Sequence, residues 1–587
     1  MSTTSDAPRP GTLLVFGDPG ALSPQDAAGG WIYLGKQDRL DALTAAFGRP
    51  PLPLGERLHL HSRRLRRPFL DLVADLGSRQ RDASSWWAGT LGWKNPAASD
   101  LFLLCCYQAL CLELAKEQRP FGAQRLAVVI EDAWLLRQLE INLRGTKTAE
   151  FRSEGRLAAA RLAAAGLGAA RRLKWLMRMI MSRLRQSWHS RGRRQDQKAP
   201  NQVLIYSHLL PRSLVGPWTD HYLTGLDEEL ATANFTVVRV ADTDSTGFEA
   251  EVAERSDNVV ALILFASPAA FMRALTALPP PAQTASLDGS SIALLLRREW
   301  WHDFSRAGRC AYLLLESCLN EFFSRTRFEA CVYPWENQPQ ERMLLLAARR
   351  AGLRTVGCQH TTLPDLMLHF FPGREEAAWA PLPDRLLACG SSPLEKLRRE
   401  GIPSGRLLLG GSRRYPPARG RGRTPNGADV LALLPLDEDQ SRKLLAAMRR
   451  VALAKKDDFR ILVKAHPAAG LKSEDLGFPA EMADGPLDSV LARCGAVVFA
   501  GTTSGIEAWL SGHPALRFRS DSLLDIDPCD MLPDGELPTA DDWNLPEKLA
   551  QLRARPKPPG ASALQALEGL FSPVNKELWL SAIRGTC

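Results

Sequence analysis

Two polar turns in the C-terminal part of the chain carry the side chains best suited to hold a phosphorylated ligand. The first turn follows the apolar run 460–465 and begins with His466 and Pro467. The second follows the apolar run 496–499 and consists of Thr502, Thr503, Ser504 and Gly505, with Glu507 in the helix expected to begin there. Hydroxyl and N–H groups at a helix N-terminus bind phosphate, and an imidazole N–H can donate to a phosphate oxygen. We therefore predict a nucleotide-binding site here, with Glu507 accepting hydrogen bonds from a ribose diol.

A purely structural interpretation of the second turn is also open. Thr and Ser are good N-cap residues, and a Glu in the first turn stabilises a helix without any ligand. The His466-Pro467 pair one strand earlier favours ligand binding. Both turns would then lie at the carboxyl edge of one parallel sheet, where α/β proteins bind phosphorylated ligands.

The middle of the chain offers side chains that could deprotonate an acceptor hydroxyl. A strand expected over 330–333 leads into a proline-rich loop that contains Glu336, Asn337 and Gln338, and the next strand should end just before His360. A general base needs a carboxylate or an imidazole within direct reach of the proton. We predict Glu336 or His360 as the catalytic base, and Asn337 and Gln338 as sugar-binding residues. The alternative is that each of them only shapes its loop.

Two arginines follow another strand-like run. Arg413 and Arg414 come after the run 406–409 and a Gly-Gly turn. An arginine there could contact a diphosphate or a sugar acid bidentately. We predict both as acceptor-binding or sugar-binding residues, with an ordinary charged loop as the alternative.

Paired carboxylates raise the question of a metal. Asp-x-Asp triplets occur at 242–244, 437–439 and 525–527, and such a pair can hold Mg²⁺ beside a diphosphate. The three triplets share no recognisable site, and they are common in loops. We expect no metal and no other cofactor, with the nucleotide-sugar serving as a substrate.

The pattern of apolar runs predicts an α/β protein built from several units. We expect an N-terminal α/β portion over 1–150, a basic amphipathic helical arm over 151–200, an acceptor-side Rossmann-like domain over 201–375 and a nucleotide-side Rossmann-like domain over 376–587. The strands of the last two units are continuous apolar runs, as expected of parallel strands covered on both faces. Two successive units of this kind should face each other.

The arm concentrates the positive charge of the chain. Residues 151–200 contain thirteen Lys or Arg and two Asp or Glu, so the rest of this chain of net charge +9 is slightly acidic. At 100° per residue the arm has one apolar side, made of Leu173, Met177, Ile180, Met181, Leu184 and Trp188. Over 156–194 this pattern is typical of a helix lying on an anionic membrane surface. The alternative is a helix that packs its apolar stripe against its own domain. Positive charge confined to one helix does not predict nucleic-acid binding.

The overall composition predicts a cytoplasmic protein, which is either free or bound at the inner face of the plasma membrane. The chain has 587 residues, 45% of them hydrophobic, and eleven scattered cysteines without metal spacing, which we expect to be reduced. The polar first ten residues do not predict a signal peptide, and we expect no transmembrane helix.

Several of these motifs together resemble known proteins. The His-Pro element followed by a Thr/Ser-rich turn and a Glu resembles GT-B glycosyltransferases that use CMP-sugars, such as bacterial sialyltransferases and Kdo transferases, and also CDP-glycerol glycerophosphotransferases. The segments 85–96, 333–339 and 357–360 are similar to the bacterial surface carbohydrate biosynthesis protein family, and the likeness runs from residue 12 to residue 575.

The resemblance implies a function and roles for the residues. It implies that His466 and 502–504 hold the nucleotide phosphate, that Glu507 holds the ribose, and that no metal is needed. The expected activity is transfer of a sugar from a nucleotide donor, expected to be CMP-linked, to a surface polysaccharide or glycolipid such as capsule or lipopolysaccharide. The alternatives are a glycerophosphate or polyol-phosphate transferase and a non-catalytic surface-glycan assembly factor.

Overall fold

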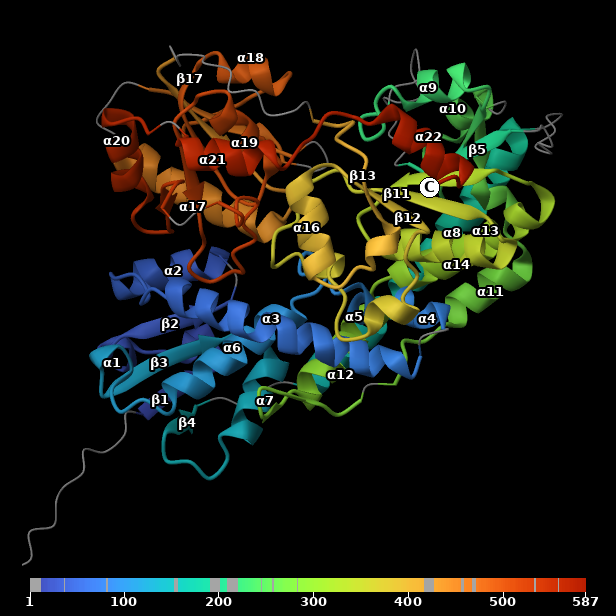
Figure 1. The fold of residues 1–587 in the computed structure, drawn as a ribbon. Coiled ribbons are helices and arrows are strands. Elements are labelled where there is room, and N and C mark those ends of the chain that lie inside the picture. The colour runs from blue at the N-terminus through green and yellow to red at the C-terminus, as the bar shows by residue number, and fades with distance from the viewer. Residues whose placement is uncertain are drawn as a thin grey trace, which may run out of the picture.

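The described part of the chain forms three parallel sheets. The computed structural model describes residues 12–35, 37–80, 83–152, 157–190, 201–207, 220–243, 245–255, 258–281, 283–415, 427–454, 459–466, 471–532, 535–557 and 559–587. Two units, one green to yellow and one orange to red, lie beside each other above the blue N-terminal unit (Figure 1).

The middle unit is built on a seven-stranded sheet in the order β13-β12-β11-β10-β5-β6-β7, in which every pair is parallel. Its strands are β5 (Gln202–Ile205), β6 (Thr236–Ala241), β7 (Val259–Ala261), β10 (Ala330–Pro334), β11 (Arg354–Cys358), β12 (Arg385–Ala388) and β13 (Leu407–Leu409). Its helices are α9 (Leu226–Thr232), α10 (Glu249–Glu254), α11 (Pro268–Thr276), α12 (Ala293–Ser305), α13 (Gly308–Arg325), α14 (Pro339–Ala351), α15 (Glu376–Trp379) and α16 (Ser391–Arg399). A short antiparallel pair, β8 (Ser286–Leu287) and β9 (Ser290–Ser291), precedes α12.

The last unit holds a six-stranded parallel sheet in the order β16-β15-β14-β17-β18-β19. Its strands are β14 (Asp429–Leu433), β15 (Ile461–Lys464), β16 (Glu481–Met482), β17 (Cys494–Phe499), β18 (Ala515–Phe518) and β19 (Thr539–Ala540). Its helices are α17 (Glu438–Ala454), α18 (Leu487–Leu491), α19 (Thr503–Leu510), α20 (Leu545–Ala554) and α21 (Ala561–Glu568). The central strands β14 and β17 are nearly continuous apolar runs because helices cover both of their faces. The expected fold class, with two Rossmann-like units, is confirmed.

The boundary expected between residues 375 and 376 is wrong. The strands β12 and β13 lie beyond that boundary, yet they pair with β11 and extend the seven-stranded sheet. The step between the two sheets therefore falls between Leu409 and Asp429. The final helix, α22 (Lys576–Arg584), packs back onto β10 and β11, where Trp579 is fully buried. A short apolar strand fits an edge of either sheet, and only the packing decides which one it joins.

The N-terminal unit has a four-stranded parallel sheet in the order β2-β3-β1-β4. Its strands are β1 (Thr12–Phe16), β2 (Trp31–Leu34), β3 (Arg125–Ile130) and β4 (Ala149–Phe151). Its helices are α1 (Pro24–Ala27), α2 (Gln37–Phe47), α3 (Gly55–Ser78), α4 (Ser84–Trp87), α5 (Thr90–Trp93), α6 (Leu101–Leu114) and α7 (Ala133–Asn142). One hydrophobic core runs from this unit into the middle unit, so the two are not separate bodies. The unit also contacts the last unit, where Tyr107 Oη donates to the carbonyl of Ser522.

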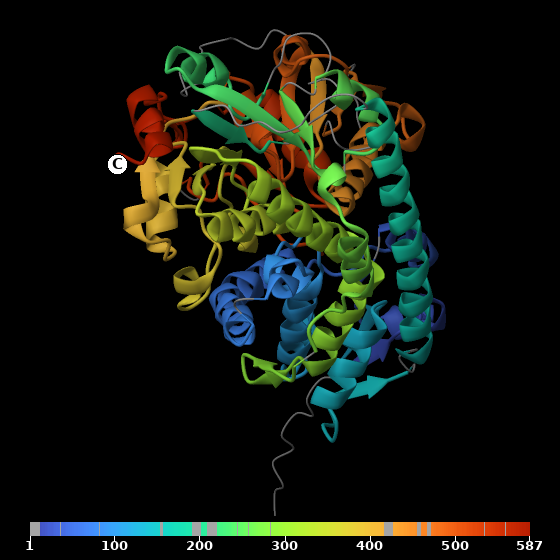
Figure 2. The same cartoon turned by 90° about the vertical axis from the view of Figure 1, so that its right-hand side faces the viewer.

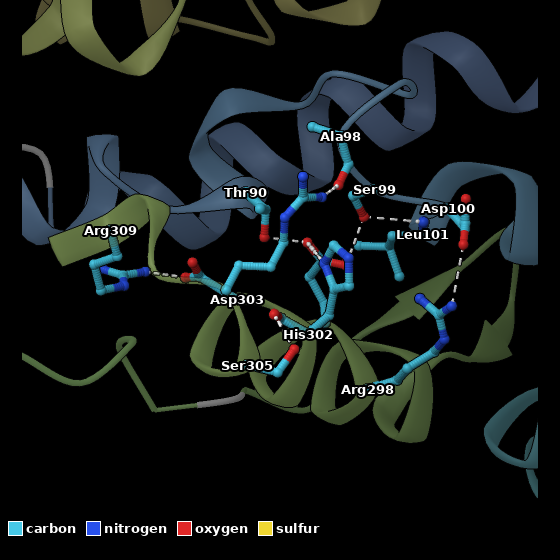
Figure 3. A network of polar contacts seen from close by, with 12 residues as sticks. Thr90, Ala98, Ser99, Asp100, Leu101, Arg298, His302, Asp303, Ser305 and Arg309 are labelled. Carbon is cyan, nitrogen blue, oxygen red and sulfur yellow. Dashed lines mark hydrogen bonds and ion pairs between the residues drawn. The ribbon is translucent and has the colours of Figure 1, made fainter. Parts of the chain in front are cut away.

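The tryptophan-rich segment 85–96 builds the junction between the N-terminal and middle units. Thr90 donates to the buried carboxylate of Glu299 on α12. Arg309 donates to the carbonyl of Ser85 across the same junction and pairs with Asp303 within its own unit (Figure 3). Gly89 is required here, because a Cβ at this position would lie 2.4 Å from Nη2 of Arg309. This part of the family-like motif therefore has a structural role in joining two units.

The arm forms one long helix, α8 (Leu157–His189), which Figure 2 shows in teal along the outside of the molecule. It packs against α10, α11 and α12. The side that faces them contains Gly168, Arg172, Trp175, Met179, Ser182 and Gln186. The six apolar residues expected on one side of the arm are all exposed, so the helix does not pack that stripe against its own domain. Residues 153–156 and 191–200 of the predicted arm lie outside the described residues.

Two expectations about the whole chain concern cysteines and membrane spans. All eleven cysteines have free thiols, and only Cys587 is exposed. Among the described helices, none combines the length and the hydropathy needed to cross a membrane.

Candidate functional site

The predicted site residues occupy the carboxyl ends of strands in both large sheets. Glu336 and His360 follow β10 and β11, which are neighbours in the seven-stranded sheet. His466 follows β15, and Thr502 follows β17, both of which flank β14 in the six-stranded sheet. Each side chain lies where a buried apolar strand gives way to a polar loop, so the local sequence alone places it at a sheet edge.

Glu336, His360 and Arg414 form one cluster at the edge of the seven-stranded sheet. Oε1 of Glu336 lies 3.2 Å from Nε2 of His360, and Nη1 of Arg414 lies 3.2 Å from Nδ1 of the same imidazole. The first contact has the length of an ion pair but not the alignment of a hydrogen bond. A guanidinium only donates, so Nδ1 must accept, and the proton of the neutral ring lies on Nε2, facing Glu336.

Two tyrosines hold this cluster. Tyr222 stands edge-on to His360, with ring centroids 4.7 Å apart. The guanidinium carbon of Arg414 lies 5.0 Å from the ring centre of Tyr222 and 4.9 Å from that of Tyr415. Stacking between two aromatic rings restricts the guanidinium to one plane, which favours bidentate binding of an anion.

Arg414 also links this cluster to the nucleotide side. Burial lowers the pKa of His466, the positive charge of Arg414 lowers it further, and the carboxylate of Glu336 opposes this effect. His466 is therefore mainly neutral at pH 7, with one N–H to donate. Arg414 and Glu336, which belong to the seven-stranded side, therefore both lie within electrostatic range of His466.

Glu507 is the acidic group on the nucleotide side. Burial raises the pKa of its carboxyl to about 7, against the opposing effect of Arg414 and with a smaller contribution from Asp488. Burial likewise raises the pKa of Tyr415 to about 12, and both Arg414 and Glu507 act on that phenol. The carboxyl of Glu507 thus lies within electrostatic range of Arg414.

The Thr/Ser-rich turn begins a helix, as expected. Thr502 is the N-cap of α19, and its side chain accepts from the backbone N–H of Ser504 at 3.4 Å. Thr502, Thr503 and Ser504 remain partly exposed, so their hydroxyl groups can reach a ligand. Gly505 faces inward instead, because a Cβ there would lie 2.1 Å from the ring of Phe499. Gly505 therefore lets α19 lie close to β17. It has no side chain with which to contact a ligand.

Arg413 is not available to bind a substrate, contrary to the prediction. Its guanidinium pairs with Glu229 at 2.5 Å, donates to the carbonyl of Thr224 at 3.1 Å and lies 4.2 Å from the ring centre of Trp579. The side chain is only 1% exposed. Arg413 therefore fixes α9 and α22 to the sheet, whereas Arg414 faces the site.

Asn337 and Gln338 also differ from the prediction. Asn337 is buried, with a φ of 56°, and its side-chain amide donates to the carbonyl of His369 at 2.6 Å, so it shapes the loop and does not face a sugar. Gln338 is partly exposed and donates to Oε2 of Glu336. It therefore orients the candidate base. Pro467 lies outside the described residues.

Three contributors to the site were not predicted from the sequence. Glu341 in the first turn of α14 accepts from the backbone N–H groups of Glu336, at 3.0 Å, and of Asn337, at 2.7 Å. Burial and the charge of Glu336 raise the pKa of this carboxyl well above its usual value. An acidic residue just after a helix-starting proline was the available signal for Glu341. No local signal marks Tyr222 or Tyr415, because their contribution depends on where Arg414 lies.

The described residues form no recognisable metal site. Within the described residues, no group of three His, Cys, Asp or Glu side chains is arranged to hold one. Of the three acidic triplets, Asp525 and Asp527 both pair with Arg517, at 2.5 Å and 3.3 Å. Asp242 accepts from Tyr206 Oη at 2.6 Å, while Asp244 lies outside the described residues.

Comparison with known proteins gives distant likenesses only. No family model matches the chain, and no curated protein does. Similar solved structures include the glycosyltransferase of kitacinnamycin (16% identical, 66% of this chain and 98% of that one, TM-score 0.36). They also include MurG of Acinetobacter baumannii (11%, 66% and 100%, TM-score 0.36) and UDP-GlcNAc 2-epimerase from Neisseria meningitidis (12%, 65% and 99%, TM-score 0.35). At these TM-scores, and with transferases and an epimerase among them, the likenesses carry no argument, and the function has to be argued from the residues of this chain.

Proposed function

We propose that this chain is a glycosyltransferase that moves a sugar from a nucleotide donor to a surface polysaccharide or glycolipid acceptor. The observation that supports this most is the position of Arg414, which contacts His360 on one sheet edge and acts on His466 and Glu507 on the other. A base candidate and a set of anion-binding groups therefore share one site. Transfer of a sugar from a phosphate leaving group to a hydroxyl acceptor requires both a base and groups that stabilise the phosphate.

Glu336 is the general base in this proposal. The imidazole of His360 has its accepting nitrogen occupied by Arg414 and its protonated nitrogen towards Glu336, so it has no lone pair left for a substrate proton. The carboxylate of Glu336 has two oxygens and remains partly exposed. We assign His360 as a positioning residue, because its imidazole ring lies between Glu336 and Arg414 and contacts both.

The reaction then follows in one displacement. A carboxylate oxygen of Glu336 takes the proton of the acceptor hydroxyl, whose oxygen attacks the anomeric carbon of the donor sugar. The bond from that carbon to the phosphate oxygen breaks, and its electron pair leaves with the nucleotide. A single displacement of this kind inverts the anomeric configuration.

The groups on the nucleotide side stabilise the departing phosphate. We assign this role to Arg414, the N–H of His466, and the hydroxyl and backbone N–H groups at the start of α19. These groups supply the charge compensation that a metal provides in other transferases, so we propose that transfer needs no metal. Glu507 accepts from the ribose diol. The resemblance points to cytosine as the base, hence to a CMP-linked donor.

Calorimetry tests the nucleotide site. Titration with CMP, CDP, UDP and GDP should show binding of CMP, and His466→Ala should weaken CMP binding about tenfold while leaving cytidine binding unchanged. Glu507→Ala should weaken both ligands, because the ribose is common to them. Arg460→Ala is the matched control: Arg460 pairs with Asp429 next to the opposite end of β15. Absence of binding for all four nucleotides would overturn the proposal.

A turnover assay distinguishes the glycosyltransferase from a glycerophosphate transferase and from an assembly factor. Release of CMP from a CMP-linked sugar in the presence of a glycan acceptor and a chelator would support a metal-independent transferase. Turnover of CDP-glycerol instead would identify a glycerophosphate transferase. Nucleotide binding without turnover of any donor would identify an assembly factor that has kept the site.

A further inference from the structure

The long helix α8 exposes an apolar stripe while a different side holds it to the protein. Gly168 faces α12, where a Cβ would lie 2.8 Å from the ring of Phe304. The guanidinium of Arg172 donates to the carbonyl groups of Leu275, at 3.0 Å, and Ala277, at 2.9 Å, near the end of α11. Docking therefore uses a small residue, hydrogen bonds and the buried side chains of Trp175 and Met179, and it leaves a second apolar side of the helix facing outward.

The outward side carries large hydrophobic residues over much of the length of the helix. Leu162 is 76% exposed, Leu173 is 60% exposed and Leu184 is 58% exposed. At 100° per residue they fall within one face, opposite the docked side. Others on or beside this face are also exposed, namely Met177, Ile180, Met181 and Trp188. Scattered apolar residues are normal at a protein surface, but a continuous stripe marks an interaction site.

Positive charge lies beside this stripe. Lys174, Arg171, Arg178 and Arg185 are all exposed on one flank of the helix, where Arg171 also donates to the carbonyl of Ser305 and Arg178 to the hydroxyl of Thr246. Their number and their position next to apolar residues are typical of helices that lie in the plane of an anionic bilayer. The same flank argues against an antiparallel pairing with a second copy of the chain, because that twofold contact along the stripe would bring these like charges to the same side.

We propose that α8 binds the protein to an anionic lipid surface, with its axis in the plane of the membrane. Leu162, Leu173 and Leu184 enter the boundary between headgroups and acyl chains, and the basic flank contacts the headgroup phosphates. The protein then lies on the membrane by one edge, the edge that Figure 2 shows in teal. This proposal does not depend on the function assigned to the site.

Flotation of the full chain with lipid vesicles tests it. The protein should float with vesicles that contain phosphatidylglycerol and much less with pure phosphatidylcholine. Leu173→Ser combined with Leu184→Ser should reduce binding at least tenfold. Lys174→Gln combined with Arg185→Gln should reduce binding to the anionic vesicles by about fivefold per charge, and added salt should do the same.

Matched controls test whether flotation depends on the apolar stripe of α8 or on exposed leucines anywhere on the protein. Leu60 and Leu453 are 66% and 79% exposed on α3 and α17, and Leu60→Ser with Leu453→Ser should leave flotation unchanged. Hydrogen exchange of α8 should slow further when anionic vesicles are added and should not change with vesicles of phosphatidylcholine alone. All variants should bind CMP as the unaltered chain does, so loss of flotation is distinguishable from loss of the nucleotide site.

Two results would overturn the proposal. The first is equal flotation of the unaltered chain and of the Leu173→Ser, Leu184→Ser variant. The second is that the unaltered chain does not float with anionic vesicles, and that light scattering gives the Leu173→Ser, Leu184→Ser variant a lower molar mass than the unaltered chain. That result would make the stripe a contact between copies of the chain.

Discussion

Arg413 and Arg414 are neighbours in the chain, but their guanidinium groups lie in different environments. Arg413 is buried against Glu229 and Trp579, whereas Arg414 lies between Tyr222 and Tyr415 and contacts His360. One residue therefore holds the fold together and the other serves the site, although their side-chain chemistry is the same.

Substituting the two arginines should separate these roles. Arg414→Gln should lower the affinity for CMP about tenfold to a hundredfold, because it removes charge-assisted hydrogen bonds, and it should leave the melting temperature nearly unchanged. Arg413→Gln should instead lower the free energy of unfolding by about 1–3 kcal/mol, since it removes one partner of a buried ion pair. Calorimetry and thermal denaturation measure the two effects. The reverse pattern would show that the arginines have been assigned the wrong way round.

Glu336→Gln should separate catalysis from binding. The amide keeps the size of the side chain and can still contact Gln338, but it cannot take a proton. We expect turnover to fall by about 10²–10⁴-fold, while the affinity for CMP changes less than about twofold. His360→Asn should reduce turnover less, because that residue only positions its neighbours. Loss of turnover in His360→Asn with turnover retained in Glu336→Gln would reassign the base.

The carboxyl of Glu507 predicts a pH dependence of ribose binding. Its pKa is about 7, and only the ionised form accepts hydrogen bonds from both ribose hydroxyls. Binding of cytidine should therefore be strongest above pH 7 and should weaken as the pH falls, by up to about tenfold per pH unit. Cytidine carries no phosphate, so protonation of His466 has little effect on this measurement. In Glu507→Gln the affinity should be lower and no longer depend on pH in this range, and a persistent slope would implicate another group.

Gly505→Ala tests whether the start of α19 must lie close to β17. The added Cβ would lie 2.1 Å from the Phe499 ring, so α19 or the ring has to move. We expect a loss of about 1–3 kcal/mol in the free energy of unfolding, together with weaker binding of CMP. Gly166→Ala is the control, because nothing lies within 4 Å of a Cβ at that exposed position in α8. It should be neutral or stabilising by up to about 1 kcal/mol. Equal stability of the two variants would contradict the tight packing of α19.

The sequence by itself determined where the polar side chains meet the sheets. Glu336, His360, His466 and Thr502 each follow a buried apolar run, and such a run ends at the carboxyl edge of a parallel strand. It also determined that 157–189 is helical with one apolar side, because helix propensity and a 3.6-residue period are local properties.

Only the tertiary structure decided which neighbours those elements have. The strands β12 and β13 pair in series with β11 and extend the seven-stranded sheet, and no local pattern in the sequence records that choice. Arg413 and Arg414 differ in role because adjacent side chains in a loop point in different directions. The helix α8 docks through Gly168, Arg172, Trp175 and Met179, whereas Leu162, Leu173 and Leu184 remain outside, because the contacts with its neighbours determine which side of the helix is covered. Hydrophobicity indicates which side of a helix needs a partner, and the shape of the surrounding protein decides whether the fold provides one.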